Sequence, residues 1–165
     1  MNTPSLKNIN TNAPYKVRRD QSNVFSFYFE TDYGLKYTIS FMLEYSFVPS
    51  GAYQFCINVE GDGRSPGDRK LRQTIFTIIE EFFTANGSDV MLYLCETGDE
   101  KEGLRNRLFI HWFNIYEHRD RYIIRTAEGK LDGVQNFTAL FSRKDNPRLE
   151  ELLAEFEETI AIVFD

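Results

Sequence analysis

The stretch from residue 53 to residue 95 constrains the fold more than any other part of the chain. Apolar residues alternate along 53–59, which predicts a strand with one buried face. Residues 90–95 are continuously apolar, as is typical of a strand covered on both faces. Between them, apolar residues at helical spacing predict a helix from about Asp68, namely Leu71, Ile75, Ile78, Ile79, Phe82 and Phe83. A strand, a helix and a second strand predict a parallel pair with a right-handed crossover.

Two hairpins extend the predicted sheet beyond this pair. Residues 24–45 contain two runs of alternating apolar residues with a glycine-containing turn between them, which predicts a hairpin before the first parallel strand. Residues 122–126 and 134–142 predict a second hairpin, joined across Gly129 and Gly133.

Two more helices follow the parallel pair. The first is predicted from a capping box at residues 97–100 to about Tyr116. We expect its buried face to contain Leu104, Leu108, Trp112 and Ile115, with Phe109 and Phe113 widening the stripe. The second begins at Asn146-Pro147, because proline is favoured in the first helical turn. Its predicted buried face comprises Leu149, Leu152, Leu153, Phe156 and Ile160.

The order of elements is therefore βββ-α-β-α-ββ-α. This order predicts an α+β fold with one mixed sheet of about six strands and a central parallel strand pair. A chain of 165 residues suits one domain, and we assign residues 24–165 to it. Residues 1–23 are polar and basic and are interrupted by Pro4 and Pro14, so they predict an extended N-terminal arm.

Charge is distributed unevenly along the chain. The arm carries four basic residues against one acid, a net charge of +3, whereas residues 145–165 carry seven acids against Arg148, a net charge of −6. One interpretation is that the arm lies on the acidic final helix, and the other is that both segments are solvated. The whole chain also has a net charge of −6. This argues against nucleic-acid binding, which depends on cations that displace counterions from phosphates.

The composition excludes several classes of protein. A hydrophobic content of 42% with 15% aromatic residues excludes intrinsic disorder. No apolar run approaches the ~20 residues that a membrane span needs, so no membrane association is expected. Two cysteines do not make a disulfide scaffold, and the first residues lack the apolar stretch of a signal peptide. We therefore expect a cytoplasmic protein with reduced thiols.

Few residues have the character of catalytic groups. His111 and His118 are the only histidines and lie in no metal-binding motif, so no metal site is predicted. The candidate catalytic residues are Glu60, Glu96 and Cys95, at the ends of the two parallel strands, where ligands bind in open α/β sheets. Alternatives remain open, because carboxylates are also common in loops and caps and Cys95 also suits a buried core position.

The loop at residues 61–67 is rich in glycine and precedes a helix. A glycine-rich turn at a helix N-terminus exposes N–H groups that bind phosphate. Arg64, Gly67 and Arg69 are therefore candidate cofactor-binding residues. The alternative is an ordinary structural loop, because acidic residues in the same segment would repel an anion and Asp68 also suits the helix N-cap.

Three motifs resemble a family of small uncharacterised bacterial proteins. They are Asp68-x-x-Leu71-x-x-Thr74-Ile75-x-x-Ile78-Ile79-x-x-Phe82-Phe83, Leu92-Tyr93-x-Cys95-x-Thr97-x-Asp99 and Arg105-x-Arg107-Leu108-Phe109-x-x-Trp112-Phe113. The resemblance runs from the first hairpin to the final helix. The family is a domain of unknown function, so the resemblance implies a shared fold and no particular activity.

The order of elements is also similar to the core of the acetyl-CoA-dependent N-acetyltransferases, which implies acetyl-CoA as the cofactor. The residues that this resemblance implies are Arg64, Gly67 and Arg69 for the pyrophosphate and Glu60 or Glu96 as general base. The chain departs from the family pattern at two positions. Arg69 replaces a small residue in the phosphate loop, and Phe109 stands where the family often has a tyrosine that acts as general acid.

The small number of candidate catalytic groups, the uneven charge and the many tyrosines predict a non-enzymatic protein-interaction or regulatory module. We expect a protein partner or a homo-oligomer. A divergent or degenerate acyltransferase is the alternative. A separate expectation concerns Arg105 and Arg107, which would lie about 200° apart on a helix. One of them should therefore reach the sheet edge or an acid such as Glu96 or Glu102.

Overall fold

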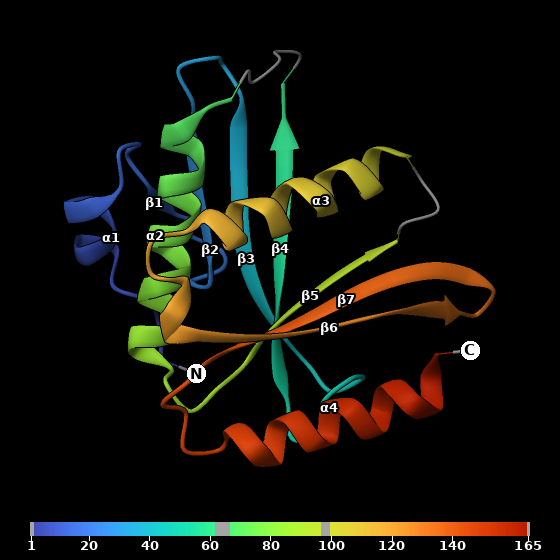
Figure 1. Ribbon diagram of the computed structural model, residues 1–165. Helices are drawn as coiled ribbons and strands as arrows, with labels where there is room; N and C mark the ends of the chain where they lie inside the picture. The colour runs from blue at the N-terminus through green and yellow to red at the C-terminus, as the bar shows by residue number, and fades with distance from the viewer. Residues whose placement is uncertain (1, 62–66, 97–99, 165) are drawn as a thin grey trace. The chain divides into compact units, whose positions relative to one another are not determined.

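The α+β class predicted from the order of elements is confirmed by the structure, a computed structural model (Figure 1). It describes residues 2–61, 67–96 and 100–164, with the backbone alone for Glu96, residues 100–103 and Arg105. The described helices are α1 (Leu6–Asn12), α2 (Arg69–Ala85), α3 (Glu100–Ile115) and α4 (Leu149–Val163), with a 3-10 turn, η1 (Arg119–Arg121). The described strands are β1 (Arg18–Arg19), β2 (Ser26–Glu30), β3 (Lys36–Glu44), β4 (Ala52–Glu60), β5 (Met91–Glu96), β6 (Tyr122–Leu131) and β7 (Val134–Arg143).

One mixed sheet contains these seven strands in the order β1-β2-β3-β4-β5-β7-β6. The central pair, β4 and β5, is parallel, as the sequence predicts, and α2 connects the two strands along the chain. Its ladder pairs Tyr53 with Met91 and Gln54 with Leu92. The strand count exceeds the expected six because β1 comes from the segment for which an extended arm is predicted.

The chain divides into two compact units. The first contains residues 1–42 and 55–86, and the second contains residues 43–54 and 87–165. In the first unit, α2 covers one face of the strands with the apolar stripe that its sequence predicts. Phe82 stacks on Phe41 with ring centroids 4.4 Å apart. The alternation along the strands places the side chains that complete this core, which are Phe27, Phe29, Ile39 and Phe55.

The prediction of an extended arm over residues 1–23 is wrong for much of its length. Residues 6–12 form α1, which Ser5 caps by accepting a hydrogen bond from the Asn8 N–H at 3.2 Å. The two prolines lie just outside the helix, so they mark its limits and do not prevent it. β1 then pairs with β2. Three apolar residues of the segment are buried, which are Ile9, Tyr15 and Val17.

Asn86, at the end of α2, fixes the start of this segment. Its side chain accepts a hydrogen bond from the Asn2 N–H and donates one to the Asn2 carbonyl, both at 2.8 Å. The segment therefore lies on α2, where α1 also packs. The side chains of Lys7, Lys16 and Arg18 are exposed, as the interpretation of solvated segments predicts, and the interpretation that places the segment on α4 stays a prediction.

In the second unit, α3 and α4 cover opposite faces of the strands β5, β7 and β6 (Figure 1). Phe109 of α3 stacks on Tyr93, and Phe113 meets Phe141 edge-on at 5.0 Å. On the other face, Leu152 and Phe156 of α4 lie in a core with Phe47, Val48, Ala52, Val90, Leu92 and Leu140. These two residues belong to the buried face predicted for the final helix.

The second hairpin is longer than the sequence predicts. β6 continues through Gly129 to Leu131, and the turn is Asp132-Gly133, both with positive φ, 50° and 80°. Gly129 does not belong to the turn. It lies in the strand because Phe164 packs against it, and a Cβ at this position would approach the Phe164 Cβ to 2.6 Å.

Candidate functional site

The face of α3 that points away from the sheet carries exposed apolar residues that the sequence predicts to be buried. Leu104, Leu108 and Ile115 were predicted to be inward, but their exposed fractions are 58%, 47% and 50%. Phe109 and Phe113 are buried instead. The prediction is wrong because α3 carries apolar residues on two opposite faces, and the two aromatic rings cover Tyr93 and Phe141 of the sheet.

The exposed residues form one continuous stripe. Leu104, Leu108, His111 and Ile115 follow one another at spacings of four, three and four residues, which confines them to an arc of about 60° on a helix. We call these four residues the outer stripe. The outward face of a surface helix is normally polar. Contiguous exposed apolar side chains therefore indicate an interaction site more often than chance exposure.

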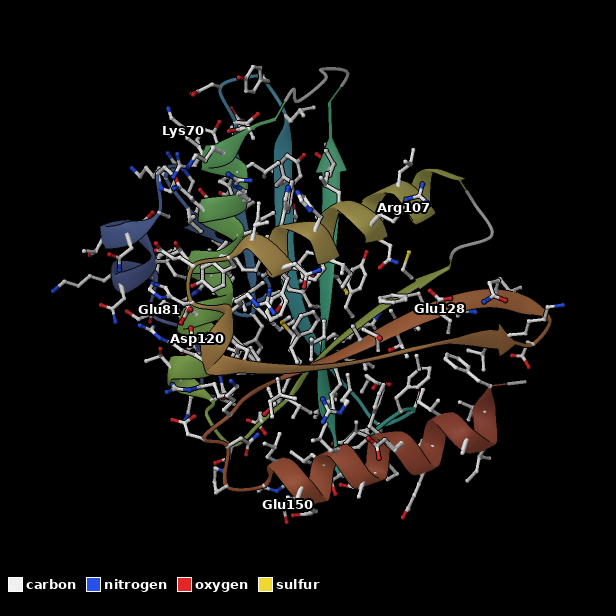
Figure 2. The ribbon with its side chains drawn as sticks, in the orientation of Figure 1. Lys70, Glu81, Arg107, Asp120, Glu128 and Glu150 are labelled. Carbon is white, nitrogen blue, oxygen red and sulfur yellow. The ribbon has the colours of Figure 1, made fainter. Side chains whose placement is uncertain are left out.

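The charges beside the outer stripe differ from those of the whole chain. Arg107 is exposed on the same helix (Figure 2). Arg119 is exposed just beyond the helix and donates a hydrogen bond to the Asn114 carbonyl at 3.0 Å. Arg121 is exposed too, and the acids that flank Arg119 and Arg121 in the sequence are Glu117 and Asp120. The described surroundings thus have a small excess of positive charge on a chain whose net charge is −6.

The expectation for Arg105 and Arg107 is only partly described. Arg107 is exposed and so does not reach the sheet. The side chain of Arg105 lies outside the described residues, as do those of Glu96 and Glu102, so its part of the expectation stays a prediction. The polar residue that α3 buries is Asn106, on the same face as Phe109 and Phe113.

The start of α2 holds the residues predicted to bind a cofactor. Arg64 lies outside the described residues, Gly67 has a φ of +41°, and Arg69 is exposed at the first position of the helix. Asp68 is the N-cap, as one alternative predicted, and its Oδ1 accepts the Leu71 N–H at 3.2 Å. A carboxylate at this end of the helix competes with any anionic ligand. The assignment of Arg64, Gly67 and Arg69 to the pyrophosphate of acetyl-CoA therefore stays a prediction.

Asp68 also belongs to a hydrogen-bonded cluster that holds the N-terminal segment. Its Oδ2 accepts a hydrogen bond from the Tyr15 hydroxyl at 2.6 Å, and the same hydroxyl accepts the Asp32 N–H at 3.2 Å. Lys70 forms an ion pair with Asp32 at 2.9 Å. Burial, together with the hydrogen bond to Asp68, raises the pKa of Tyr15 to about 12. The cluster links the N-terminal segment and the turn at Asp32 to the start of α2.

The candidate catalytic residues are not assembled into a site by the described contacts. Glu60 is exposed at the end of β4, in the first unit. Cys95 is buried in the second unit, on the face of β5 that also carries Tyr93 and that α3 covers. The side chain of Glu96 lies outside the described residues. Their proposed roles as base or nucleophile remain predictions.

No group of three or more histidine, cysteine, aspartate or glutamate side chains is placed to hold a metal ion within the described ranges. Among the described helices, none has the length and apolar character needed to cross a bilayer.

Sequence reasoning missed the outer stripe, although a signal for it was present. The six apolar residues 104, 108, 109, 112, 113 and 115 span about half of the helix circumference, which is wider than one buried face requires. Such a helix can pack one set of its apolar residues on the sheet while another set remains available for a second contact. The spacing alone did not show which of the two faces the sheet would take.

Comparison with known proteins identifies a family but no activity. The profile of a family of unknown function, DUF6169, matches residues 67–158, from the start of α2 into α4. No curated protein and no solved structure matches the chain. The similarity to the N-acetyltransferases therefore rests on the order of elements alone and stays a prediction. Because the matched residues make up more than half of the sequence, the chain belongs to the DUF6169 family of unknown function.

Proposed function

We propose that this chain is a non-enzymatic protein-interaction module that binds an amphipathic helix of a partner protein on the outer stripe of α3. The observation that supports this most directly is the exposure of Leu104, Leu108 and Ile115, each about half exposed, on one face of a helix whose opposite face is already packed. Folding of the chain does not account for these three side chains, whereas a partner would.

The spacing of the outer stripe favours a helix as the bound element. Helices bind one another through side chains at spacings of three and four residues, which is how the four residues of the outer stripe are arranged. Complete burial of a leucine or isoleucine is worth about 1.5–3 kcal/mol, so covering the exposed half of each would contribute roughly 1 kcal/mol. Three such contacts favour a reversible complex.

The charge beside the outer stripe favours an acidic partner. Arg107 and Arg119 are exposed next to its middle and its end. Carboxylates at the edge of the partner helix would meet these guanidinium groups, which form directional paired hydrogen bonds with carboxylates. Opposite charges at the rim of an interface raise the association rate and select the partner more than they raise affinity.

Site-specific photocrosslinking in the native cell tests this proposal. A benzoylphenylalanine replaces Leu108 in one variant and Ile162 in the control, because Ile162 is 82% exposed but lies on α4. We expect position 108 alone to crosslink, to a peptide that forms an amphipathic helix with flanking Asp or Glu. Equal yields at both positions, absence of an adduct at 108, or an adduct to a basic peptide would contradict the proposal.

A second measurement uses the partner peptide that crosslinking identifies. Leu108→Glu should weaken its binding at least tenfold in fluorescence anisotropy, because a carboxylate would replace an apolar contact and repel an acidic partner. Ile162→Glu is the matched control and should leave the affinity within twofold. Similar losses in both variants would show that the peptide does not bind at the outer stripe.

A further inference from the structure

β6 is the end strand of the sheet on the side of the second unit. β7 pairs with it along its whole length, from Tyr122 opposite Arg143 to Leu131 opposite Val134. Within residues 2–61, 67–96 and 100–164, no strand pairs with its other edge. A long edge strand presents unpaired N–H and C=O groups to any chain that can align with it.

The hairpin turn determines which residues of β6 face outward. In a hairpin with a two-residue turn, the flanking residues, here Leu131 and Val134, exchange backbone hydrogen bonds, and the pattern repeats at every second residue. Odd-numbered residues of β6 therefore bond to β7, and the even-numbered residues direct their N–H and C=O outward. Two contacts agree with this assignment. The Ile124 carbonyl accepts a hydrogen bond from the Arg125 side chain at 3.3 Å, and the Tyr122 N–H donates to the Arg119 carbonyl.

Side-chain contacts fix the two faces of the strand. Tyr122 meets Phe113 of α3, so even-numbered side chains lie on the α3 side. Arg125 lies 3.9 Å from Glu157 of α4, so odd-numbered side chains lie on the α4 side. Two copies can pair antiparallel around a two-fold axis perpendicular to the sheet. The α3 sides of both copies then lie on the same face of the joined sheet, so even-numbered residues face even-numbered residues and odd-numbered residues face odd-numbered ones.

We propose that a second copy of this chain pairs with β6 along this edge, antiparallel and centred on Ala127. In this register the outward N–H and C=O groups from Ile124 to Lys130 all gain partners. Ile123 faces Leu131 of the second copy on the α4 side, and both side chains are partly buried already. This surface is independent of the outer stripe of α3.

The charges of β6 and the length of the paired stretch together select this register, since an axis at Gly129 opposes no like charges but would pair only residues 127–131 of the strand. An axis centred on Arg125, Glu128 or Lys130 would place that residue directly opposite the same residue of the second copy. Two like charges would then face each other across the strand pair, which is destabilising. With the axis at Ala127, Arg125 faces Gly129, Thr126 faces Glu128 and Ile124 faces Lys130, so no like charges are directly opposed. An axis at Thr126 would use Tyr122, whose N–H is already bonded to Arg119.

Cysteine crosslinking tests the register. Ala127 would face itself in a non-hydrogen-bonded pair with Cα atoms ~4.5 Å apart, which suits a disulfide. Ala127→Cys should therefore form a disulfide-linked dimer under mild oxidation. Arg125→Cys, whose two copies would lie about four residues apart along the strand, is the matched control. Equal rates in the two variants, or no dimer from Ala127→Cys, would overturn the proposal.

The mass in solution tests the pairing itself. We expect the wild-type mass from light scattering to rise from 19.4 kDa towards twice that value with increasing concentration. Thr126→Pro removes an outward N–H without touching the ladder to β7, so it should keep the chain monomeric. A monomeric wild type at millimolar concentration, or a Thr126→Pro dimer, would contradict the proposal. If Thr126→Pro does not fold, the cysteine pair still decides.

Discussion

α2 and α3 are helices of similar length, with 17 and 16 residues, and they differ in where their apolar residues lie. Every large apolar side chain of α2 is buried. In α3, Phe109 and Phe113 are buried, whereas Leu104, Leu108 and Ile115 are exposed on the opposite face. Packing within one unit explains the whole apolar pattern of α2. In α3, packing within the unit explains only the buried apolar residues, and the exposed apolar residues are available for a partner.

The ends of the two helices reinforce this difference. Asp68 and Asn86, at the two ends of α2, hold the N-terminal segment. α2 is thus bound by the sheet on one side and by a segment of its own chain on another. Among the described contacts of α3, its neighbours are the strands β5, β6 and β7 and the turn η1, and the outer stripe remains exposed.

The strongest test of the comparison removes one buried ring from each helix. Phe82→Ala in α2 and Phe109→Ala in α3 should each lower the free energy of unfolding by about 3–5 kcal/mol, because each leaves a cavity at a buried aromatic site. Urea denaturation at 25 °C measures both. A loss below about 1 kcal/mol for Phe109→Ala would mean that α3 does not pack through this face.

The next effect concerns the N-terminal segment on α2. Asn86→Ala removes hydrogen bonds to the N–H and C=O of Asn2 and to the Phe82 carbonyl, so we expect a loss of about 1–3 kcal/mol. Amide exchange of residues 2–12 should accelerate with it. Asn12→Ala is the control, because Asn12 is exposed and its side chain donates to the Asn8 carbonyl within α1. Unchanged exchange in Asn86→Ala would show that Asn86 does not hold the segment.

Tyr15 makes the attachment of the N-terminal segment to α2 dependent on pH. Tyr15→Phe removes the hydroxyl that donates to Asp68, at an expected cost of about 1–2 kcal/mol near neutral pH. The pKa of Tyr15 in the folded chain is raised to about 12 from 10.0, so folding favours the protonated hydroxyl. Its contribution is complete below pH 10 and is lost as the pH rises through 12. The stability difference between wild type and Tyr15→Phe should therefore shrink between pH 10 and 12, and a constant difference would refute this assignment.

A smaller effect is expected on the outer stripe. Leu108→Gln should change the free energy of unfolding by less than about 0.5 kcal/mol, because the side chain is half exposed and glutamine has a similar helix propensity. The comparison with Phe109→Ala, one residue away, is then a direct measure of the two faces of α3. A loss above 2 kcal/mol for Leu108→Gln would place Leu108 in the core.

The smallest expected effect is that of acetyl-CoA. Because Asp68 occupies the N-terminus of α2, we expect no change in Tm when acetyl-CoA is added at millimolar concentration. A ligand present at ~100 Kd would add ~2.7 kcal/mol of stability, which differential scanning fluorimetry detects easily. A clear rise in Tm would favour the acyltransferase alternative over the interaction module.

The sequence predicted the parts of the fold in which one pattern dominates. The strands around the parallel pair, the stripe of α2 and the Asp68 cap follow from local periodicity and capping chemistry. α1 was missed because a single residue, Ile9, is buried in it, so seven residues carry no helical period. The length of β6 was missed because Gly129 is a turn signal locally, and only the contact with Phe164 shows its place in a strand.

The candidate site was harder to predict than the fold. The outer stripe depends on which of two apolar faces of α3 meets the sheet, and that choice is made by Tyr93 and Phe141, far away in the sequence. Predicted catalytic residues were chosen from their positions at strand ends, which does not determine what surrounds them. Local patterns describe an element, whereas a site depends on contacts between elements.

The chain passes between its two units three times, at residues 42–43, 54–55 and 86–87. Neither unit is therefore a continuous piece of sequence, and a protease that cuts one loop cannot release either of them as an intact fragment. The stretch shared with the family begins inside the first unit and ends inside the second. An exchange of one continuous stretch between genes therefore cannot carry either unit whole without part of the other.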